Sequence, residues 1–165
     1  MAPNNQKSKA DIKTGSEQSV ARSSIDYGLL PNLIGFNMRR TQIKIFQAFA
    51  ETVGRYDVTP GQFGVLEIIH NNPGLNQSEL GVAMSVDRST VVAVIDRLEG
   101  RDLVVRAPSP KDRRSYALRL SSGGEELLRT LQPLVQEHDQ RAGQCLSAAE
   151  QATLIDYLKR LEKNN

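Results

Sequence analysis

The sequence contains very little cysteine and histidine, the soft ligands that hold structural metals such as zinc, and cysteine alone forms disulfides. Among its 165 residues are one cysteine, Cys145, two histidines, His70 and His138, and no tryptophan. A single cysteine excludes an intramolecular disulfide, and three such residues scattered along the chain give no spaced cluster for a structural metal. We therefore expect no metal and no cofactor. Cys145 is interpreted as a packing residue, and the histidines as helix-surface or interface residues.

Long apolar runs and common enzyme motifs are missing as well. No run of about 18 uncharged apolar residues occurs, and the first residues lack the apolar core of a secretory signal. We therefore expect a cytoplasmic protein that does not enter a membrane. There is no glycine-rich phosphate loop, no Gly-x-Ser-x-Gly sequence and no histidine with an identifiable nucleophilic partner. These absences indicate that the protein is not an enzyme.

The residues that are present suffice for one compact domain. Apolar residues make up 39% of the chain and charged residues 24%, and a chain of this length can bury one core. Residues 1–25 are polar and lack apolar periodicity, which predicts a flexible N-terminal tail. Residues 26–165 are predicted to form a single domain, mainly α-helical with a small β-hairpin.

A long amphipathic helix is predicted at about residues 30–54. Its apolar side chains recur at steps of three or four residues, which is the period of one helix face. The helix is longer than a small core requires. Its apolar positions are Leu33, Phe36, Ile43, Phe46, Phe49 and Val53.

Three shorter helices follow, and each opens with a capping signal. Thr59 and Asn76 are both followed three residues later by the Gln or Glu of a capping box. Asp87 is the predicted N-cap of a helix over residues 88–99. The second and third of these helices are separated by a tight turn, as in a helix-turn-helix. The buried stripe of the helix after Asp87 is predicted to be Val91, Ile95 and Leu98.

The apolar period then changes to two over residues 103–106 and 116–120, which predicts two antiparallel strands. Their connection, residues 108–114, is long and charged, so it is predicted to project as a wing. Two more helices are predicted after Ser121 and Ser147, the first bent by Pro133. The winged unit thus covers about residues 58–121, while the helices at about 30–54 and 122–163 lie outside it.

Positive charge is concentrated around the predicted wing. Between Arg88 and Arg114 there are seven basic residues and four acids. A phosphate-facing surface has such a concentration, and so has an ordinary solvated loop. A helix followed by a charged hairpin is, however, a known arrangement for reading DNA, with the helix in the major groove. The candidate DNA contacts are Arg88, Ser89, Thr90 and Arg97 of the helix and Lys111, Arg113 and Arg114 of the wing.

Three of these candidates have a second interpretation. Ser89 and Thr90 would serve equally well as additional N-cap residues, and Arg97 as a solvated cation. The neighbouring wing favours DNA contact for all three.

The order of these motifs resembles the MarR family of bacterial regulators. The resemblance rests on Asn76–Leu80, Val86–Val91, Ile95–Glu99 and Lys111–Arg114, followed by a leucine-rich helix. It implies a homodimer whose N- and C-terminal helices intertwine and whose winged units bind successive major grooves of a pseudo-palindrome, most simply as a repressor. It also implies that Asp112 braces the wing and that Arg113 or Arg114 enters a narrow A·T-rich minor groove.

Two positions depart from the family pattern. Ala93 stands where a basic residue is frequent, which predicts fewer base contacts in the middle of the helix. Asp102 occupies a turn where many members have Gly, and Asp tolerates left-handed backbone better than most residues. Neither change alters the predicted fold.

The resemblance further implies a ligand cleft between the dimer helices and the winged unit. An arginine beside aromatic walls suits a small aromatic carboxylate that releases the DNA. An aromatic acyl-CoA thioester is an alternative effector, and a dimer that binds proteins rather than DNA is an alternative function. The same side chains would also serve as ordinary core and dimer-interface residues. The implied ligand residues are Phe36, Arg39, Arg40, Gln62, Phe63 and Leu66.

Overall fold

The structure is a computed structural model that describes residues 25–108 and 116–164. Residues 1–24, which make up nearly all of the predicted tail, lie outside the described part. Two 3-10 turns, η1 (Leu30–Asn32) and η2 (Gly54–Tyr56), flank the first helix. The main elements, in chain order, are α1 (Ile34–Val53), α2 (Pro60–Asn71), α3 (Gln77–Met84), α4 (Arg88–Glu99), β1 (Val104–Pro108), β2 (Tyr116–Leu120), α5 (Ser122–Gly143) and α6 (Ala148–Lys163).

The helices begin where the capping signals predict. Thr59 Oγ1 accepts from the Gln62 amide at 3.2 Å while Gln62 Oε1 accepts from the Thr59 amide at 2.9 Å. Equivalent boxes open α3 at Asn76 and α6 at Ser147. Because each cap satisfies backbone donors that the helix leaves unpaired, these starts are fixed by local sequence.

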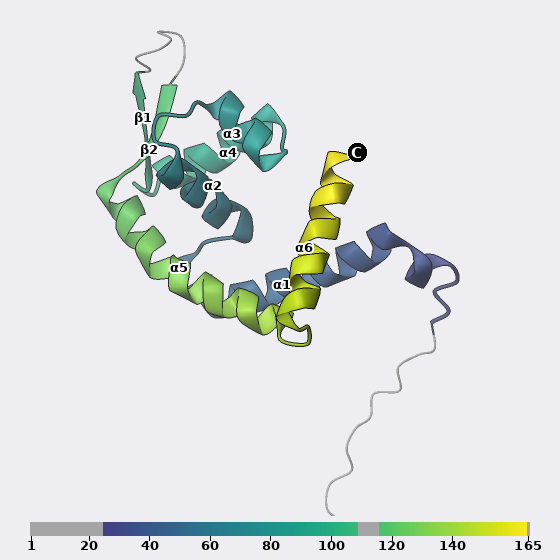
Figure 1. The fold of residues 1–165 in the computed structure, drawn as a ribbon. Coiled ribbons are helices and arrows are strands. Elements are labelled where there is room, and N and C mark those ends of the chain that lie inside the picture. The colour runs from purple at the N-terminus through teal and green to yellow at the C-terminus, as the bar shows by residue number, and fades with distance from the viewer. Residues whose placement is uncertain (1–24, 109–115, 165) are drawn as a thin grey trace, which may run out of the picture.

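The winged unit is built around one apolar cluster, to which α2, α3, α4, the hairpin and the start of α5 all contribute. The predicted stripe of α4 is confirmed, since Val91, Ile95 and Leu98 are all buried. Figure 1 shows α3 and α4 beside the hairpin, with α5 leaving from the base of β2. The buried members of the cluster are Val65, Leu66, Ile69, Leu80, Val91, Ile95, Leu98, Leu103, Val104, Leu118 and Leu128.

The hairpin is tied to the helix pair by backbone hydrogen bonds. Val104 pairs with Leu120 and Pro108 with Tyr116. On the other side of β2, the Leu118 amide donates to the Leu75 carbonyl at 2.8 Å, and the Gly74 amide donates to the Leu118 carbonyl at 2.9 Å. The loop before α3 therefore extends the pairing of the hairpin, which the alternation of apolar residues did not indicate.

Strict alternation is also broken at the start of β1, where Leu103 and Val104 are both buried and Val105 is exposed. Leu103 is covered by the first turn of α5. A Cβ at Gly124 would lie 2.0 Å from the Leu103 carbonyl oxygen, so only glycine permits this approach. Asp102, just before, adopts φ 54°, the left-handed conformation expected for this turn.

A second cluster joins the end of α1 to the middle of α5 and contains Phe49, Val53, Val58 and Leu131. His138 extends it: the ring is buried and meets Phe49 edge-on, with centroids 5.6 Å apart. Of the two interpretations of His138, a surface position is excluded because its ring is buried against Phe49 of α1. A role at an interface stays a prediction. His70 lies at the surface, where its Nδ1 is 2.8 Å from Glu125 Oε2.

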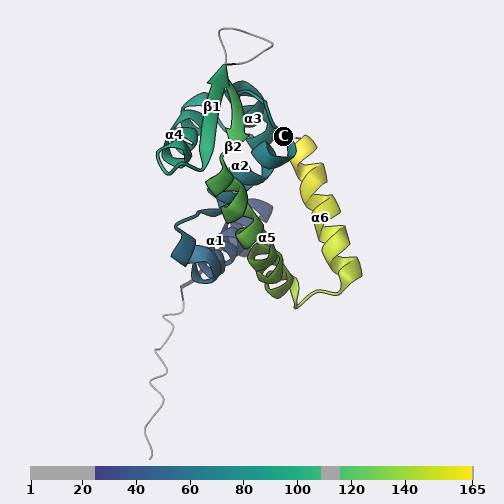
Figure 2. The same cartoon turned by 90° about the vertical axis from the view of Figure 1, so that its left-hand side faces the viewer.

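The remaining apolar faces of α1 and α6 are exposed in this chain. Phe49 and Val53 are the buried residues of α1, and α6 has none. Figure 2 shows α6 standing apart from α5 beyond the turn that joins them. Within the described ranges, no helix combines the length and the hydropathy that crossing a membrane requires.

Candidate nucleic-acid interface

The exposed side of α4 is set by its buried side. Because Val91, Ile95 and Leu98 point into the core, the side chains on the opposite side of the helix face outward. The exposed residues include all four helix candidates together with Ala93 and Asp96. The prediction of which residues α4 presents is thus confirmed, whereas their contact with DNA stays a prediction.

The N-terminus of α4 is organised by Asp87. Its carboxylate accepts hydrogen bonds from the Ser89 hydroxyl, from the Thr90 amide at 3.0 Å and from the Thr90 hydroxyl at 2.7 Å. These hydrogen bonds, the one from the Ser89 side chain above all, hold the pKa of Asp87 far below its usual range. Both hydroxyls thus act in capping, and their oxygens remain available only as acceptors.

Arg97 lies two turns along α4 and is paired within the chain. Its Nη2 is 3.5 Å from both carboxylate oxygens of Asp57, which precedes α2. Both side chains are largely exposed, so the pair is weak and can exchange partners. Arg97 is therefore neither buried nor an isolated solvated cation.

Arg106 connects β1 to the acids of α4. Its guanidinium is 2.5 Å from Asp96 Oδ1 and also contacts Glu99 Oε2. With the amide oxygen of Gln77 turned toward it, Gln77 accepts from Nη2 at 3.1 Å and from Nε at 3.2 Å. Three elements of the winged unit meet at this half-buried side chain, which also neutralises the acids of the candidate recognition helix.

Sequence reasoning counted Arg101 and Arg106 only as part of a basic segment, and the structure gives both a positioning role. Arg101 donates to the Tyr56 and Asp57 carbonyls at the end of η2. The one signal in the sequence for the role of Arg106 is its place in a predicted strand, because a cation that becomes partly buried there requires an acidic partner. In the part of the chain that the structure describes, Arg88 alone among the basic residues between 88 and 108 has no acidic partner.

Arg88 borders a surface hollow at the turn between α3 and α4. The hollow has a volume of about 390 Å³ and is lined by residues of α3 and of the turn. Val82, on its rim, is 82% exposed. This is the most open apolar side chain near the candidate interface, and it was not among the predicted contacts.

The wing candidates Lys111, Arg113 and Arg114, and the predicted brace Asp112, lie outside the described residues. The structure fixes the strands on either side of them. β1 ends at Pro108 directly opposite Tyr116, the first residue of β2. The segment that carries these residues therefore begins and ends at the tip of the paired strands.

The six implied ligand residues fall in different environments. Arg40 stands 5.5 Å from the ring centres of both Phe36 and Tyr27 and lines a hollow of about 490 Å³. Gln62 is buried in the α2 capping box, and Leu66 is fully buried in the main cluster. Within this single chain, Phe36 and Arg40 are thus brought together without Gln62 or Leu66.

The two other implied ligand residues are also separate from each other. Arg39 donates to Gln42 at 3.0 Å on the exposed side of α1. Phe63 packs between the two clusters, with its ring centre 6.4 Å from that of Phe49.

Comparison with known proteins gives consistent matches. The family model described as MarR family matches residues 58–116. A putative transcriptional regulatory protein for the hcr operon of Thauera aromatica is 45% identical over 140 residues, which are 84% of this chain and 84% of that protein. The chain belongs to the MarR family. The predicted family and the predicted winged helix-turn-helix fold class are thereby confirmed, and the protein is a transcriptional regulator with a DNA-binding fold.

Solved structures of other MarR-family proteins superpose well. The transcriptional repressor CouR bound to a 23-mer DNA duplex matches with a TM-score of 0.79 and 35% identity over 85% of this chain and 99% of that chain. CouR bound to p-coumaroyl-CoA matches with a TM-score of 0.79 and 32% identity over 86% of this chain and 99% of that chain. BpsR of Bordetella bronchiseptica matches with a TM-score of 0.75 and 25% identity over 79% of this chain and 93% of that chain. The DNA binding of BpsR is regulated by 6-hydroxynicotinic acid.

The Asp87 cap generates a pH prediction. Because the pKa of Asp87 is lowered in the folded protein, its charged cap stabilises the fold above the unfolded pKa of about 4 and loses that effect as pH falls further. Asp87→Asn keeps an acceptor but removes the charge. We expect this variant to melt at a lower temperature than wild type at pH 7, with the difference shrinking below about pH 4. Equal differences at pH 7 and pH 3, measured by circular dichroism, would contradict the assignment.

Proposed function

We propose that this protein is a homodimeric repressor that binds a pseudo-palindromic operator and leaves it when a small aromatic carboxylate binds. The same regulator responding to an aromatic acyl-CoA thioester is the alternative. The observation that carries the proposal is the outward face of α4, with Arg88 at its N-terminus and a hairpin beside it. The match to the DNA-bound CouR structure over nearly all of that chain supports the same use of this face.

In this proposal α4 enters the major groove and residues 111–114 reach the neighbouring backbone or minor groove. Arg88 supplies a free cation next to the helix N-terminus, where amide groups and the positive end of the helix dipole favour phosphate. Arg97 leaves the Asp57 carboxylate and contacts DNA instead. Ser89 and Thr90 shape the helix start, and Asp112 braces the wing through an ion pair with one of its arginines.

The DNA contacts are tested with single substitutions to alanine at Arg88, Arg97, Arg113 and Arg114. Each is expected to weaken binding to a duplex selected from a random library by roughly tenfold, because each removes a charge-assisted contact. Removal of a cation that binds phosphate should also make the slope of log K against log salt shallower by about one unit. Arg129→Ala on α5 is the control cation. Unchanged binding by both wing variants would exclude the wing model, and no binding by wild type would favour the protein-binding alternative.

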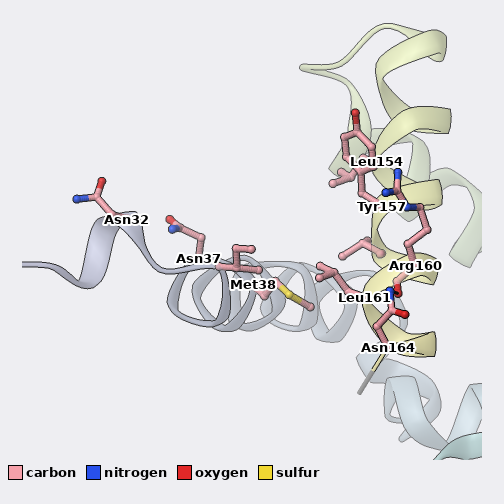
Figure 3. A pocket seen from close by; sticks show the side chains of 10 residues that line it. Asn32, Asn37, Met38, Leu154, Tyr157, Arg160, Leu161 and Asn164 are labelled. Atoms are coloured by element: carbon pink, nitrogen blue, oxygen red, sulfur yellow. Dashed lines mark hydrogen bonds between the residues drawn. The ribbon is translucent and has the colours of Figure 1, made fainter.

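Dimerisation is supported by the apolar surface that one chain leaves open. A hollow of about 550 Å³ between the start of α1 and α6 is lined by Ile34, Met38, Leu154 and Leu158, among others. Figure 3 shows Met38 and Leu161 directed into this space from the two helices. Exposed large apolar residues on these helices are too numerous for a stable monomer surface, so a second copy that inserts its own helices accounts for them.

Leu158→Glu tests the dimer, because it places a charge in the middle of this apolar surface at a position that is 40% exposed. We expect the variant to sediment as a monomer at micromolar concentration while the wild type sediments as a dimer. Val82→Glu, which adds the same charge to an exposed apolar position of the winged unit, is the matched control and should remain dimeric. A dimeric Leu158→Glu protein would contradict the proposed interface.

An aromatic effector is supported by a cation and a ring of α1, Arg40 and Phe36, and by the ring of Tyr27, which precedes that helix. Arg40, Phe36 and Tyr27 combine a positive charge with aromatic faces, and Lys44 lines the same hollow. A carboxylate on an aromatic body matches this pair of properties, as does an aromatic thioester whose phosphates meet the cations. The two chemical classes include 6-hydroxynicotinic acid, which regulates DNA binding by BpsR, and p-coumaroyl-CoA, to which CouR is bound.

The effector is tested in a DNA-release assay that compares free hydroxylated benzoic and cinnamic acids with the CoA thioesters of the same acids. We expect one of the two classes to raise the Kd for DNA at least about tenfold, a coupling usual for regulated binding. Arg40→Ala should reduce that response while leaving DNA affinity without effector unchanged, and Arg129→Ala should preserve both. If neither class changes the Kd, the proposed effectors are wrong.

A further inference from the structure

The end of the candidate recognition helix is fastened to the end of the first helix by Arg101. Arg101 lies just after α4, and its guanidinium reaches the turn that follows α1. Its Nη1 donates to the Asp57 carbonyl at 2.5 Å and its Nη2 to the Tyr56 carbonyl at 2.8 Å. A planar guanidinium can donate to two neighbouring oxygens at once, which a single ammonium cannot reproduce.

Both ends of this link are firmly held. The Tyr56 side chain packs on the cluster that contains Phe49, Val53 and Leu131, which joins α1 to α5. Asp57 adopts a left-handed backbone with φ 49°, and its amide donates to the Gly54 carbonyl at 3.0 Å. On the other side, α4 is locked into the winged core by its buried stripe. Arg101 therefore links the cluster that joins α1 to α5 with the core of the winged unit, in addition to the side chains of Phe63 and Leu127 that pack on both.

Asp57 adds a separate, electrostatic component. Its carboxylate is 3.7 Å from Arg101 Nη1 and 3.5 Å from Arg97 Nη2, and it is 71% exposed. The main-chain carbonyls that Arg101 binds do not depend on this carboxylate. The link consequently has a geometric part, made by Arg101 and backbone, and a charge part that restrains Arg97.

We propose that Arg101 is a positioning residue that sets the angle between α4 and α1 and thereby the operator spacing that the dimer accepts. The inference rests on the proposed function. Since α1 belongs to the dimer interface of that proposal, the angle of α4 to α1 fixes the distance and rotation between the two recognition helices. Asp57 competes with DNA for Arg97 and lowers affinity for every operator alike.

The experiment compares three duplexes in binding assays with the full-length protein. One is an operator selected by the wild type from a random library, and the others have one base pair inserted or removed at its centre. One base pair rotates the half-sites by roughly 34° relative to each other, because B-DNA has about 10.5 base pairs per turn. The quantity measured is the ratio of Kd values for altered and native spacing.

We expect the wild type to discriminate against altered spacing by on the order of thirtyfold, the scale of a poorly fitting site. Arg101→Ala should reduce that ratio to about threefold, because the winged units can then rotate on the dimer helices. Arg101→Lys, with one point donor in place of a fork, should fall between the two. Ratios are used because the loss of a cation changes affinity for all three duplexes equally.

Two further variants separate geometry from charge. Asp57→Asn should tighten binding to all three duplexes by about threefold while keeping the wild-type ratio, because it frees Arg97 and leaves the carbonyls in place. Arg55→Ala is the matched control: Arg55 belongs to the same turn but contacts the Tyr56 ring and hydroxyl, with Cζ 4.8 Å from the ring centre. It should leave the ratio unchanged.

A wild-type ratio in Arg101→Ala, or an equal loss of discrimination in Arg55→Ala, would overturn the inference. If Arg101→Ala loses its cooperative thermal transition, the test relies on Arg101→Lys instead. A wild-type ratio of Kd values in Arg101→Lys would then overturn the inference. Absence of any DNA binding by the wild type would defeat the proposed function itself. Binding with discrimination that Arg101 does not affect would defeat only this inference.

Discussion

The burial of Val91, Ile95 and Leu98 under α4 is the constraint from which the candidate interface follows. Once these side chains are in the core, the other side of the helix can only face outward. The same packing brings Asp96 and Glu99 within reach of Arg106 on β1, so the helix and the hairpin are joined by charge as well as by apolar contact. The position of the wing strands relative to α4 thus depends on how α4 is buried.

The electrostatics of the winged unit differ from a simple basic patch. Arg97, Arg101 and Arg106 each face a carboxylate, which leaves Arg88 as the unpaired cation of the described part between residues 88 and 108. Ala93 adds no charge to the middle of α4. Nothing in the structure explains the charge of Asp102, although its backbone conformation suits the turn. A large share of any phosphate affinity must therefore come from the few cations that remain free or can exchange partners.

Helices α1 and α6 present the opposite situation, because this chain leaves many of their apolar residues exposed. The end of α1 is closed by Phe49, Val53 and His138, but its first half and all of α6 remain open. In the proposed dimer, the second chain would pack against this exposed apolar surface. The exposure also explains why the implied ligand residues are not gathered in one place here: the N-terminal half of α1 is not covered by this chain.

The sequence by itself determined the order of elements, the helix starts, the buried stripe of α4 and the family. These depend on contacts between residues three or four apart and on apolar period, which are local properties. Only the tertiary structure decided the partners of the cations, because Arg97 meets Asp57 across 40 positions and Arg101 meets Tyr56 across 45. It also decided that β2 pairs with Leu75 and that Gln62 and Leu66 are buried. No local pattern specifies which distant groups meet, since that depends on how the whole core packs.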